Sequence, residues 1–243
     1  MTELDLRAEP LANLRDVGGL PAADGTAVRP GLLFRSAGPH GLDAAAAADV
    51  AARLGLGVVV DLRNPDEREA TPWPVLPDGV VVQVLPLLPP GPMPVFPEAF
   101  GEKEFGAWYA ELASGGAAQL ARIVRTLADP DCPPALVHCA AGKDRTGIVV
   151  ACVLDLLGVA HDVIAADYHR TEDAIDAILA LRPVVPSDIV PENLPPVVMR
   201  APAGAMLGCL ATVRDQHGGF RELLLRQGMT ADDITRLRAR MTM

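Results

Sequence analysis

Short apolar runs recur at four places along the chain. They lie at Leu32–Ser36, Gly57–Asp61, Val80–Leu85 and Ala135–Cys139. These runs are largely apolar at consecutive positions, which is typical of strands buried on both faces of a parallel sheet. The pattern therefore predicts strands that lie inside the molecule, with other elements covering both sides of their sheet.

Segments with the helical spacing of apolar residues alternate with these strands. Asp43 is placed to cap a helix, and Ala117–Ala128 is amphipathic. A third helix is expected to start near Thr146, and Thr230 with Asp233 resembles a capping box before the last one. Strands alternating with helices predict an α/β fold, in which a central, mainly parallel sheet of about four or five strands is flanked by helices.

Two proline-rich stretches interrupt this alternation, near residues 86–104 and 183–203. Long irregular connections within a compact domain are often lids over a binding site. Neither stretch separates two halves that could each bury a core. We therefore expect a single domain over residues 1–243, with two lid-like segments.

The composition narrows the class of protein and of partner. The chain has a formal net charge of −10 and 50% hydrophobic residues, which indicates a globular protein. The excess negative charge argues against binding to nucleic acid or to anionic membranes, and no apolar run is long enough to span a bilayer. A local basic site must therefore attract any anionic substrate.

Cysteine usage and the N-terminus bear on the compartment. The four cysteines lack the paired spacing of zinc sites and disulfide frameworks, and the first residues show no secretory signal pattern. We expect a reduced, cytoplasmic protein that needs no metal ion or other cofactor.

One stretch, VHCAAGKDRTG at residues 137–147, gathers reactive and charged side chains between an expected strand and an expected helix. This order aims backbone N–H groups at one point and makes an anion site. Cys139 lies there, where the dipoles and the cations Lys143 and Arg145 favour its thiolate. Arg145 can also hold two phosphoryl oxygens with its planar guanidinium. Together these groups are what phosphate-ester hydrolysis through a cysteinyl-phosphate requires.

The same stretch carries a family resemblance. HCAAGKDRTG resembles the signature loop of cysteine-dependent protein tyrosine phosphatases, and its Lys-Asp pair resembles the bacterial atypical branch, tyrosine phosphatase family 3. Other motifs of that branch match in the same order: NLRDVGGL from Asn13, RPGLLFRSAGPHGL from Arg29, VVDLRNPDERE from Val59 and ADYHRTED from Ala166. The resemblance covers the chain from Leu11 onward.

The resemblance implies roles for the loop residues. Cys139 is the expected nucleophile and Arg145 the expected phosphate clamp, while Thr146 would stabilise the thiolate or assist its release. Lys143 is a candidate for contact with substrate oxygens. The expected phosphate-binding residues are Ala140, Ala141, Gly142, Lys143, Asp144, Arg145 and Thr146.

Supporting roles are expected for four residues outside that loop. His138 would brace the loop from behind. Arg15, Asp16 and Arg35 are further candidates for support of the site, and a turn or an ion pair within the fold is the alternative for each.

The general acid has two main candidates, Asp61 and Asp144, and residues such as Asp167 are a further alternative. Asp61 ends one expected strand and Cys139 ends another, and the carboxyl ends of parallel strands open onto the same crevice. Asp144 lies within the loop itself. A leaving oxygen needs a proton from one of them. Asp61 is preferred, and the choice between the two stays open.

These expectations describe a phosphatase for phosphotyrosine, and as a dual-specificity enzyme also for phosphoserine and phosphothreonine. A phosphoinositide or small phosphate ester is the alternative substrate, and an inactive phosphate-binding module is a third hypothesis. The expected partners are a phosphorylated protein or a phosphoinositide. Neither nucleic acid nor an inserted membrane segment is expected.

Overall fold

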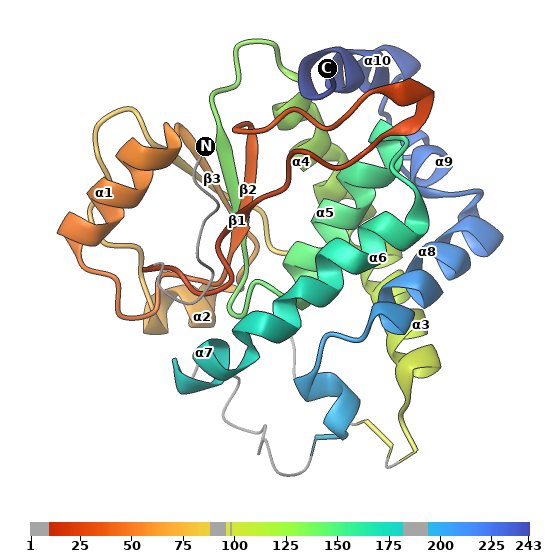
Figure 1. Ribbon diagram of the computed structural model, residues 1–243, viewed down its shortest axis with the longest axis horizontal. Coiled ribbons are helices and arrows are strands. Elements are labelled where there is room, and N and C mark those ends of the chain that lie inside the picture. Colours follow the sequence, from red (N-terminus) through yellow and green to blue (C-terminus); the bar gives the residue numbers. More distant parts are fainter. Residues whose placement is uncertain (1–9, 88–95, 98, 182–193) are drawn as a thin grey trace.

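A five-stranded sheet forms the centre of the protein in the computed structural model, which describes residues 10–87, 96–97, 99–181 and 194–243 (Figure 1). The strands are β1 (Arg15–Asp16), β2 (Leu33–Ser36), β3 (Val58–Asp61), β4 (Val81–Val84) and β5 (Ala135–His138), in the order β1-β2-β5-β3-β4. All neighbours are parallel except β1, which pairs antiparallel with β2. The expected mainly parallel sheet is confirmed.

Helices account for most of the remaining described chain. They are α1 (Ala44–Leu54), α2 (Pro65–Ala70), α3 (Glu102–Gly115), α4 (Ala117–Ala128), α5 (Asp144–Leu157), α6 (His161–His169), α7 (Ile175–Ala180), α8 (Ala203–His217), α9 (Phe220–Leu225) and α10 (Ala231–Met241). Short 3-10 turns lie at Ala23–Gly25, Arg170–Ala174 and Pro196–Met199.

Several local predictions are confirmed. The Asp43 carboxylate accepts a hydrogen bond from the backbone N–H of Ala46 at the start of α1. Thr230 and Asp233 form the expected capping box of α10. Helix α5 begins at Asp144, two residues before the expected Thr146. The polar residues of the loop therefore form its first turn.

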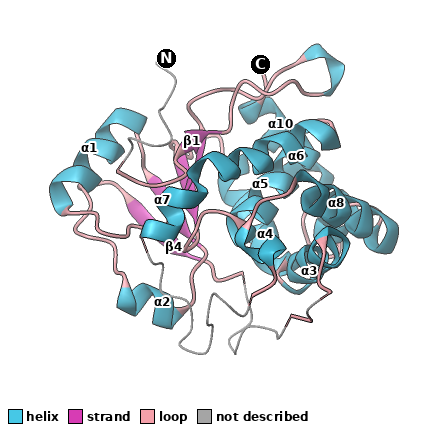
Figure 2. Ribbon diagram, turned by 60° about the horizontal axis from the view of Figure 1, so that its bottom comes forward, coloured by secondary structure: helices cyan, strands magenta, loops and turns pink. Residues whose placement is uncertain are grey.

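Helices lie on both sides of the sheet (Figures 1 and 2), and the strands β2, β5 and β3 are fully buried, as their apolar residues require. The expected burial of the fourth run is wrong, because β4 is the edge strand and its Val81 and Val84 are exposed. Val59, Phe34 and Leu136 pack toward α1 in a small cluster. Their neighbours along the strands, such as Val60 and Val137, pack into the larger core that includes α3, α4, α5, α6 and α8. This alternation follows from the period of two along a strand.

The expected lid-like segments fall partly outside the described residues, which do not include 88–95, 98 and 182–193. The described parts are ordered elements: α3 begins at Glu102, and a 3-10 turn occupies Pro196–Met199. The single-domain interpretation stays a prediction. Among the helices the structure describes, none is long and apolar enough to cross a membrane.

Candidate active site

The carboxyl ends of the three central strands meet at one edge of the sheet. In the register, Ser36 of β2 and Asp61 of β3 both lie opposite His138 of β5. Cys139 follows directly and is 1% exposed. The loop after it leads into α5, whose first N–H groups have no partner within the helix and favour negative charge. The order of strand, loop and helix thus places the buried thiol of Cys139 at a helix terminus that favours anions.

Two backbone carbonyls of the loop accept hydrogen bonds from other segments of the chain. The Ala140 carbonyl accepts hydrogen bonds from the backbone N–H of Gly38 at 2.9 Å and from His40 Nε2 at 3.1 Å. The Gly142 carbonyl accepts from Asn13 Nδ2 and Arg35 Nη2, both at 2.9 Å. In a trans peptide the N–H points opposite to the carbonyl. The N–H groups that follow these two carbonyls therefore face away from the supports and are available to an anion.

Gly142 is required by the close approach of the loop to β2. Its φ is +66°, a left-handed conformation that other residues rarely adopt. A Cβ atom here would lie 2.3 Å from the carbonyl oxygen of Ser36. The loop can pack onto the strand end only because this position has no side chain.

A buried ion cluster lies beneath Gly142. Asp167 of α6 accepts from Arg15 Nε at 3.0 Å and from Arg35 Nη1 at 2.7 Å, and all three side chains are almost fully buried. Burial alone would raise the pKa of Asp167, but the two guanidinium groups outweigh it and lower that pKa. Burial and the neighbouring Arg35 lower the pKa of Arg15 to about 10. Asp167 thus holds Arg15 and Arg35, and Arg35 supports the loop directly at the Gly142 carbonyl.

Arg145 retains two free donors for a phosphoryl group. Its Nη1 and Nη2 each bind one oxygen of Glu67 at 2.6 Å, and Nη1 also donates to the Leu62 carbonyl at 3.3 Å. A guanidinium has five N–H donors, so these contacts within the described chain leave two of them: the Nε–H and one Nη2–H. These two lie on one edge of the group and match two oxygens of a phosphate.

Glu67 is a site residue that the sequence analysis did not single out. It comes from α2, where Asn64 and Glu67 form a capping box behind Pro65. Burial opposes ionisation, but the hydrogen bonds and charge of Arg145 outweigh it and lower the pKa of Glu67. Burial lowers the pKa of Arg145, and the contacts with Glu67 reverse the effect and raise it. The sequence NPDE at residues 64–67 indicates a capped helix start, but it does not show that Glu67 lies opposite Arg145.

His138 directly precedes Cys139, and its imidazole ring is neutral. Its Nε2 accepts a hydrogen bond from Trp73 Nε1 at 2.9 Å, so the ring proton is on Nδ1, which donates to the Cys139 carbonyl at 3.0 Å. Burial, aided by the charge of Arg63, outweighs the Asp61 carboxylate and lowers the pKa of His138 to about 4. The ring therefore contacts the loop backbone without carrying charge at neutral pH.

This lowered pKa predicts a loss of stability in mild acid. Between pH 6.5 and 4 the unfolded chain binds a proton on His138 that the folded protein does not, so stability falls as pH falls through this window. We expect the free energy of unfolding to drop by about 2 kcal/mol between pH 7.5 and pH 5 from this group. Urea unfolding at both pH values measures it.

The matched variants for this experiment are His138→Asn and His169→Asn, the second at an exposed position. Asparagine keeps a donor for the Cys139 carbonyl but cannot titrate. The first variant is expected to flatten the pH dependence, and the second to leave it unchanged. An unchanged dependence in His138→Asn would contradict the neutral buried ring.

Asp61 does not reach an open space. Its carboxylate is 0% exposed and accepts from Arg63 Nε at 2.9 Å and Nη2 at 2.7 Å. Burial would raise its pKa, but the hydrogen bonds and charge of Arg63 outweigh this and lower the pKa of Asp61. A carboxyl held ionised inside the protein is a poor proton donor near neutral pH. This geometry opposes the acid role preferred from the sequence.

Asp144 and Lys143 are neighbours that differ in exposure to solvent and in hydrogen-bond partners. The Asp144 side chain is 28% exposed, and its Oδ1 accepts from the Tyr109 hydroxyl at 2.5 Å. The Lys143 ammonium lies 3.3 Å from the same oxygen and donates to the carbonyls of Val198 and Arg200. Asp144 therefore combines a fixed position with access to solvent. The ammonium is engaged by main-chain carbonyls rather than free for a substrate.

Two further expected residues complete the description. The Thr146 hydroxyl is buried and has no hydrogen-bond partner among the described residues, which leaves it available to a thiolate or a bound oxyanion. Asp16 accepts from the backbone N–H groups of Gly18 and Gly31, both at 2.7 Å. It therefore fixes a turn, the alternative that the sequence left open.

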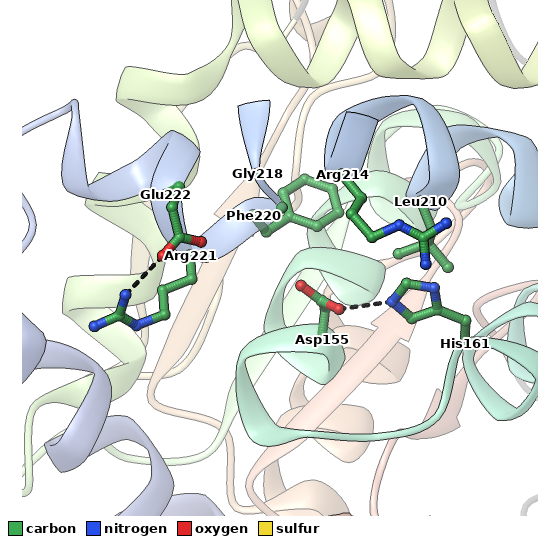
Figure 3. Close-up of a pocket in the computed structure, with 9 residues that line it drawn as sticks. Asp155, His161, Leu210, Arg214, Gly218, Phe220, Arg221 and Glu222 are labelled. Carbon is green, nitrogen blue, oxygen red and sulfur yellow. Dashed lines mark hydrogen bonds and ion pairs between the residues drawn. The ribbon is translucent and has the colours of Figure 1, made fainter. Parts of the chain in front are cut away.

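A separate pocket of about 150 Å³ lies at the other end of α5 (Figure 3). Asp155 and His161 pair there at 2.9 Å, beside Arg214, Phe220 and Glu222. Asp155 and Asp144 are eleven residues apart on one helix, which corresponds to roughly 16 Å along its axis. This pocket is therefore separate from the loop Cys139–Thr146, here called the phosphate loop. The described residues contain no group of three or more side chains suited to a metal ion.

Comparison with known proteins agrees with the geometry of the loop. A model of the tyrosine phosphatase family matches residues 6–243. A Cupriavidus necator protein named as a tyrosine-protein phosphatase is 38% identical over 180 residues, a match that covers 68% of this chain and 62% of that protein. The triple specificity protein phosphatase PtpB of Mycobacterium tuberculosis is 30% identical over 268 residues, covering 93% of this chain and 95% of PtpB.

The match with the Cupriavidus protein thus spans less than two thirds of that protein's length. Among solved structures, the core catalytic domain of the PP-IP phosphatase SIW14 from S. cerevisiae has a TM-score of 0.36 and 20% identity, over 57% of this chain and 70% of that one. That similarity is too low to argue from. The family match covers nearly the whole chain, and it includes the loop from Cys139 to Thr146. The chain belongs to the tyrosine phosphatase family.

Proposed function

We propose that this protein hydrolyses phosphotyrosine in proteins through a cysteinyl-phosphate on Cys139. The observation that carries the proposal is the joint placement of a buried thiol, backbone donors at a helix terminus and the two free N–H groups of Arg145. Each of these groups favours an anion, and together they suit a phosphoryl group beside a nucleophilic thiol.

The reaction has two steps. The Cys139 thiolate attacks phosphorus, the bond to the tyrosyl oxygen breaks, and that oxygen takes a proton from an acid. Water then attacks the phosphorus of the cysteinyl-phosphate, the P–S bond breaks, and the same residue accepts a proton from the water. Arg145 and the loop N–H groups stabilise the charge on the equatorial oxygens in both steps. Inorganic phosphate leaves and the thiolate is restored.

We assign the acid to Asp144 and not to Asp61. Asp144 is partly exposed and belongs to the loop that holds the phosphate, whereas the carboxylate of Asp61 is fully buried against Arg63. A general acid must reach the leaving oxygen directly or through one water. The role of Asp61 is then to hold Arg63 beside the strand end.

The assignment predicts a dependence on the leaving group. Asp144→Asn should lower kcat/KM about a hundredfold for phenyl phosphate, whose leaving oxygen is basic, and little for dinitrophenyl phosphate. Asp61→Asn should lower both values by the same factor, because it disturbs structure rather than proton transfer. Initial rates on a series of aryl phosphates measure this. The opposite pattern would assign the acid to Asp61.

Substrate breadth is the finer part of the proposal. The name of PtpB, triple specificity protein phosphatase, supports a range beyond phosphotyrosine, and phosphoserine, phosphothreonine and phosphoinositides are the alternatives to test. The engaged ammonium of Lys143 does not favour a second phosphate on the substrate. A panel of phosphopeptides and phosphoinositide vesicles, compared by phosphate release, decides among them. A higher kcat/KM on the phosphoinositide than on any phosphopeptide would assign the lipid, and not a phosphoprotein, as the substrate.

A further inference from the structure

Two buried tyrosine hydroxyls connect the interior of the protein to Asp144. The Tyr109 hydroxyl of α3 donates to Asp144 Oδ1 at 2.5 Å, and the hydroxyls of Tyr109 and Tyr168 lie 2.7 Å apart. An ionised carboxylate can only accept, so the Tyr109 proton points at Asp144. Tyr109 must then accept the proton of Tyr168. The chain of hydrogen bonds has one direction, from Tyr168 through Tyr109 to Asp144.

Packing alone does not account for these hydroxyls. Tyr109 is 0% exposed and Tyr168 1% exposed, and the Tyr109 ring lies among Phe105 and Trp108. Phenylalanine would fill the same space without a polar atom whose burial must be compensated by hydrogen bonds. Burial and the Asp144 charge raise the pKa of Tyr109 and Tyr168 well above the usual range. Both hydroxyls therefore keep their protons near neutral pH.

The backbone of α5 makes room for the second tyrosine. A Cβ atom on Gly147 would lie 2.9 Å from Cδ2 of the Tyr168 ring. That ring therefore lies directly against the first turn of α5, the turn that begins with Asp144. The hydroxyl of Tyr168 reaches Tyr109 because of this close approach.

We propose that Tyr109, held in place by Tyr168, is a positioning residue that fixes the Asp144 carboxyl and directs its transferable proton to Oδ2. This rests on the proposed role of Asp144 as the acid. A donor on Oδ1 leaves Oδ2 as the oxygen that carries the proton. When that proton passes to the leaving oxygen, the hydrogen bond from Tyr109 becomes charge-assisted and stabilises the carboxylate that forms. Both tyrosines keep their own protons throughout.

Two cations also act on Asp144 and must be considered in any pH experiment. Lys143 Nζ lies 3.3 Å from Oδ1, and the charges of Arg145 and Asp144 interact. Neither is altered by a substitution that removes only a phenolic oxygen. The effect of Tyr109 can therefore be separated from theirs.

The experiment compares Tyr109→Phe, Tyr168→Phe and Asp144→Asn with the native protein, by kcat/KM on phenyl phosphate and dinitrophenyl phosphate. Tyr109→Phe is expected to lower the value for phenyl phosphate about tenfold and to leave dinitrophenyl phosphate little changed. Tyr168→Phe should act in the same direction and less strongly.

Trp108→Phe is the control, since it changes the packing beside Tyr109 and keeps both hydroxyls. It should not show the leaving-group dependence. Equal losses on both substrates in Tyr109→Phe would overturn the positioning role. If Asp144→Asn itself lacks a leaving-group dependence, the acid assignment fails together with this proposal, while the cysteinyl-phosphate on Cys139 stands.

Discussion

Replacing Cys139 with serine is expected to lower kcat/KM for aryl phosphates by a factor on the order of 10⁴ or more, because nothing else at the loop can accept the phosphoryl group. A serine hydroxyl remains protonated where a thiol ionises. The loop N–H groups and Arg145 would still bind phosphate, so the variant should keep its affinity for inorganic phosphate. Phosphate release measures the activity, and calorimetric titration of the variant with inorganic phosphate measures the affinity.

Cys132→Ser is the matched control. Cys132 lies in the loop between α4 and β5, is only partly buried, and has no contact with the phosphate loop. Its activity should equal that of the native protein. Activity retained by Cys139→Ser would rule out the covalent cysteine. Loss of activity when a chelator is added to the native protein would instead indicate a metal-dependent phosphatase.

Asp167→Ala is expected to destabilise the fold by about 3–5 kcal/mol, since it leaves the guanidiniums of Arg15 and Arg35 buried without their shared counter-ion. A typical domain has only about 5–15 kcal/mol in total, so this loss would be a large share of the stability. In the folded fraction, Arg35 would lose the partner that orients it toward the Gly142 carbonyl. Urea unfolding at neutral pH gives the free energy.

Asp173→Ala provides the comparison, because Asp173 lies near Asp167 in the chain but is exposed. A surface substitution of this kind changes stability by less than about 0.5 kcal/mol. A loss below about 1 kcal/mol in Asp167→Ala would show that the buried cluster contributes little. The position of Gly142 would then depend on its packing against Ser36 rather than on Asp167 and the two arginines.

The local parts of this protein were determined by the sequence itself. Three of the four apolar runs became the buried strands β2, β3 and β5, because consecutive apolar residues can be buried only where both faces of a strand are covered. The run Val80–Leu85 became the edge strand β4, where Val81 is 56% exposed, so its expected burial was wrong. The loop at Cys139 followed from the order of strand, glycine-flanked polar turn and helix. Capping at Asp43 and Thr230 depends on residues three positions away, within reach of any local analysis.

Tertiary structure alone decided which charged groups meet. Glu67 reaches Arg145 from 78 residues away, and Asp167 reaches Arg15 from 152 residues away. From the sequence, Asp61 lay at the end of an apolar strand and Asp144 within the loop after Cys139, and neither position revealed the surroundings of its carboxyl group. They differ because Arg63 folds back onto Asp61 and buries it, whereas Tyr109 arrives from α3 to hold Asp144 at the surface of the loop. Ionisation depends on burial and on neighbours in space, and neither is encoded in any short stretch of chain.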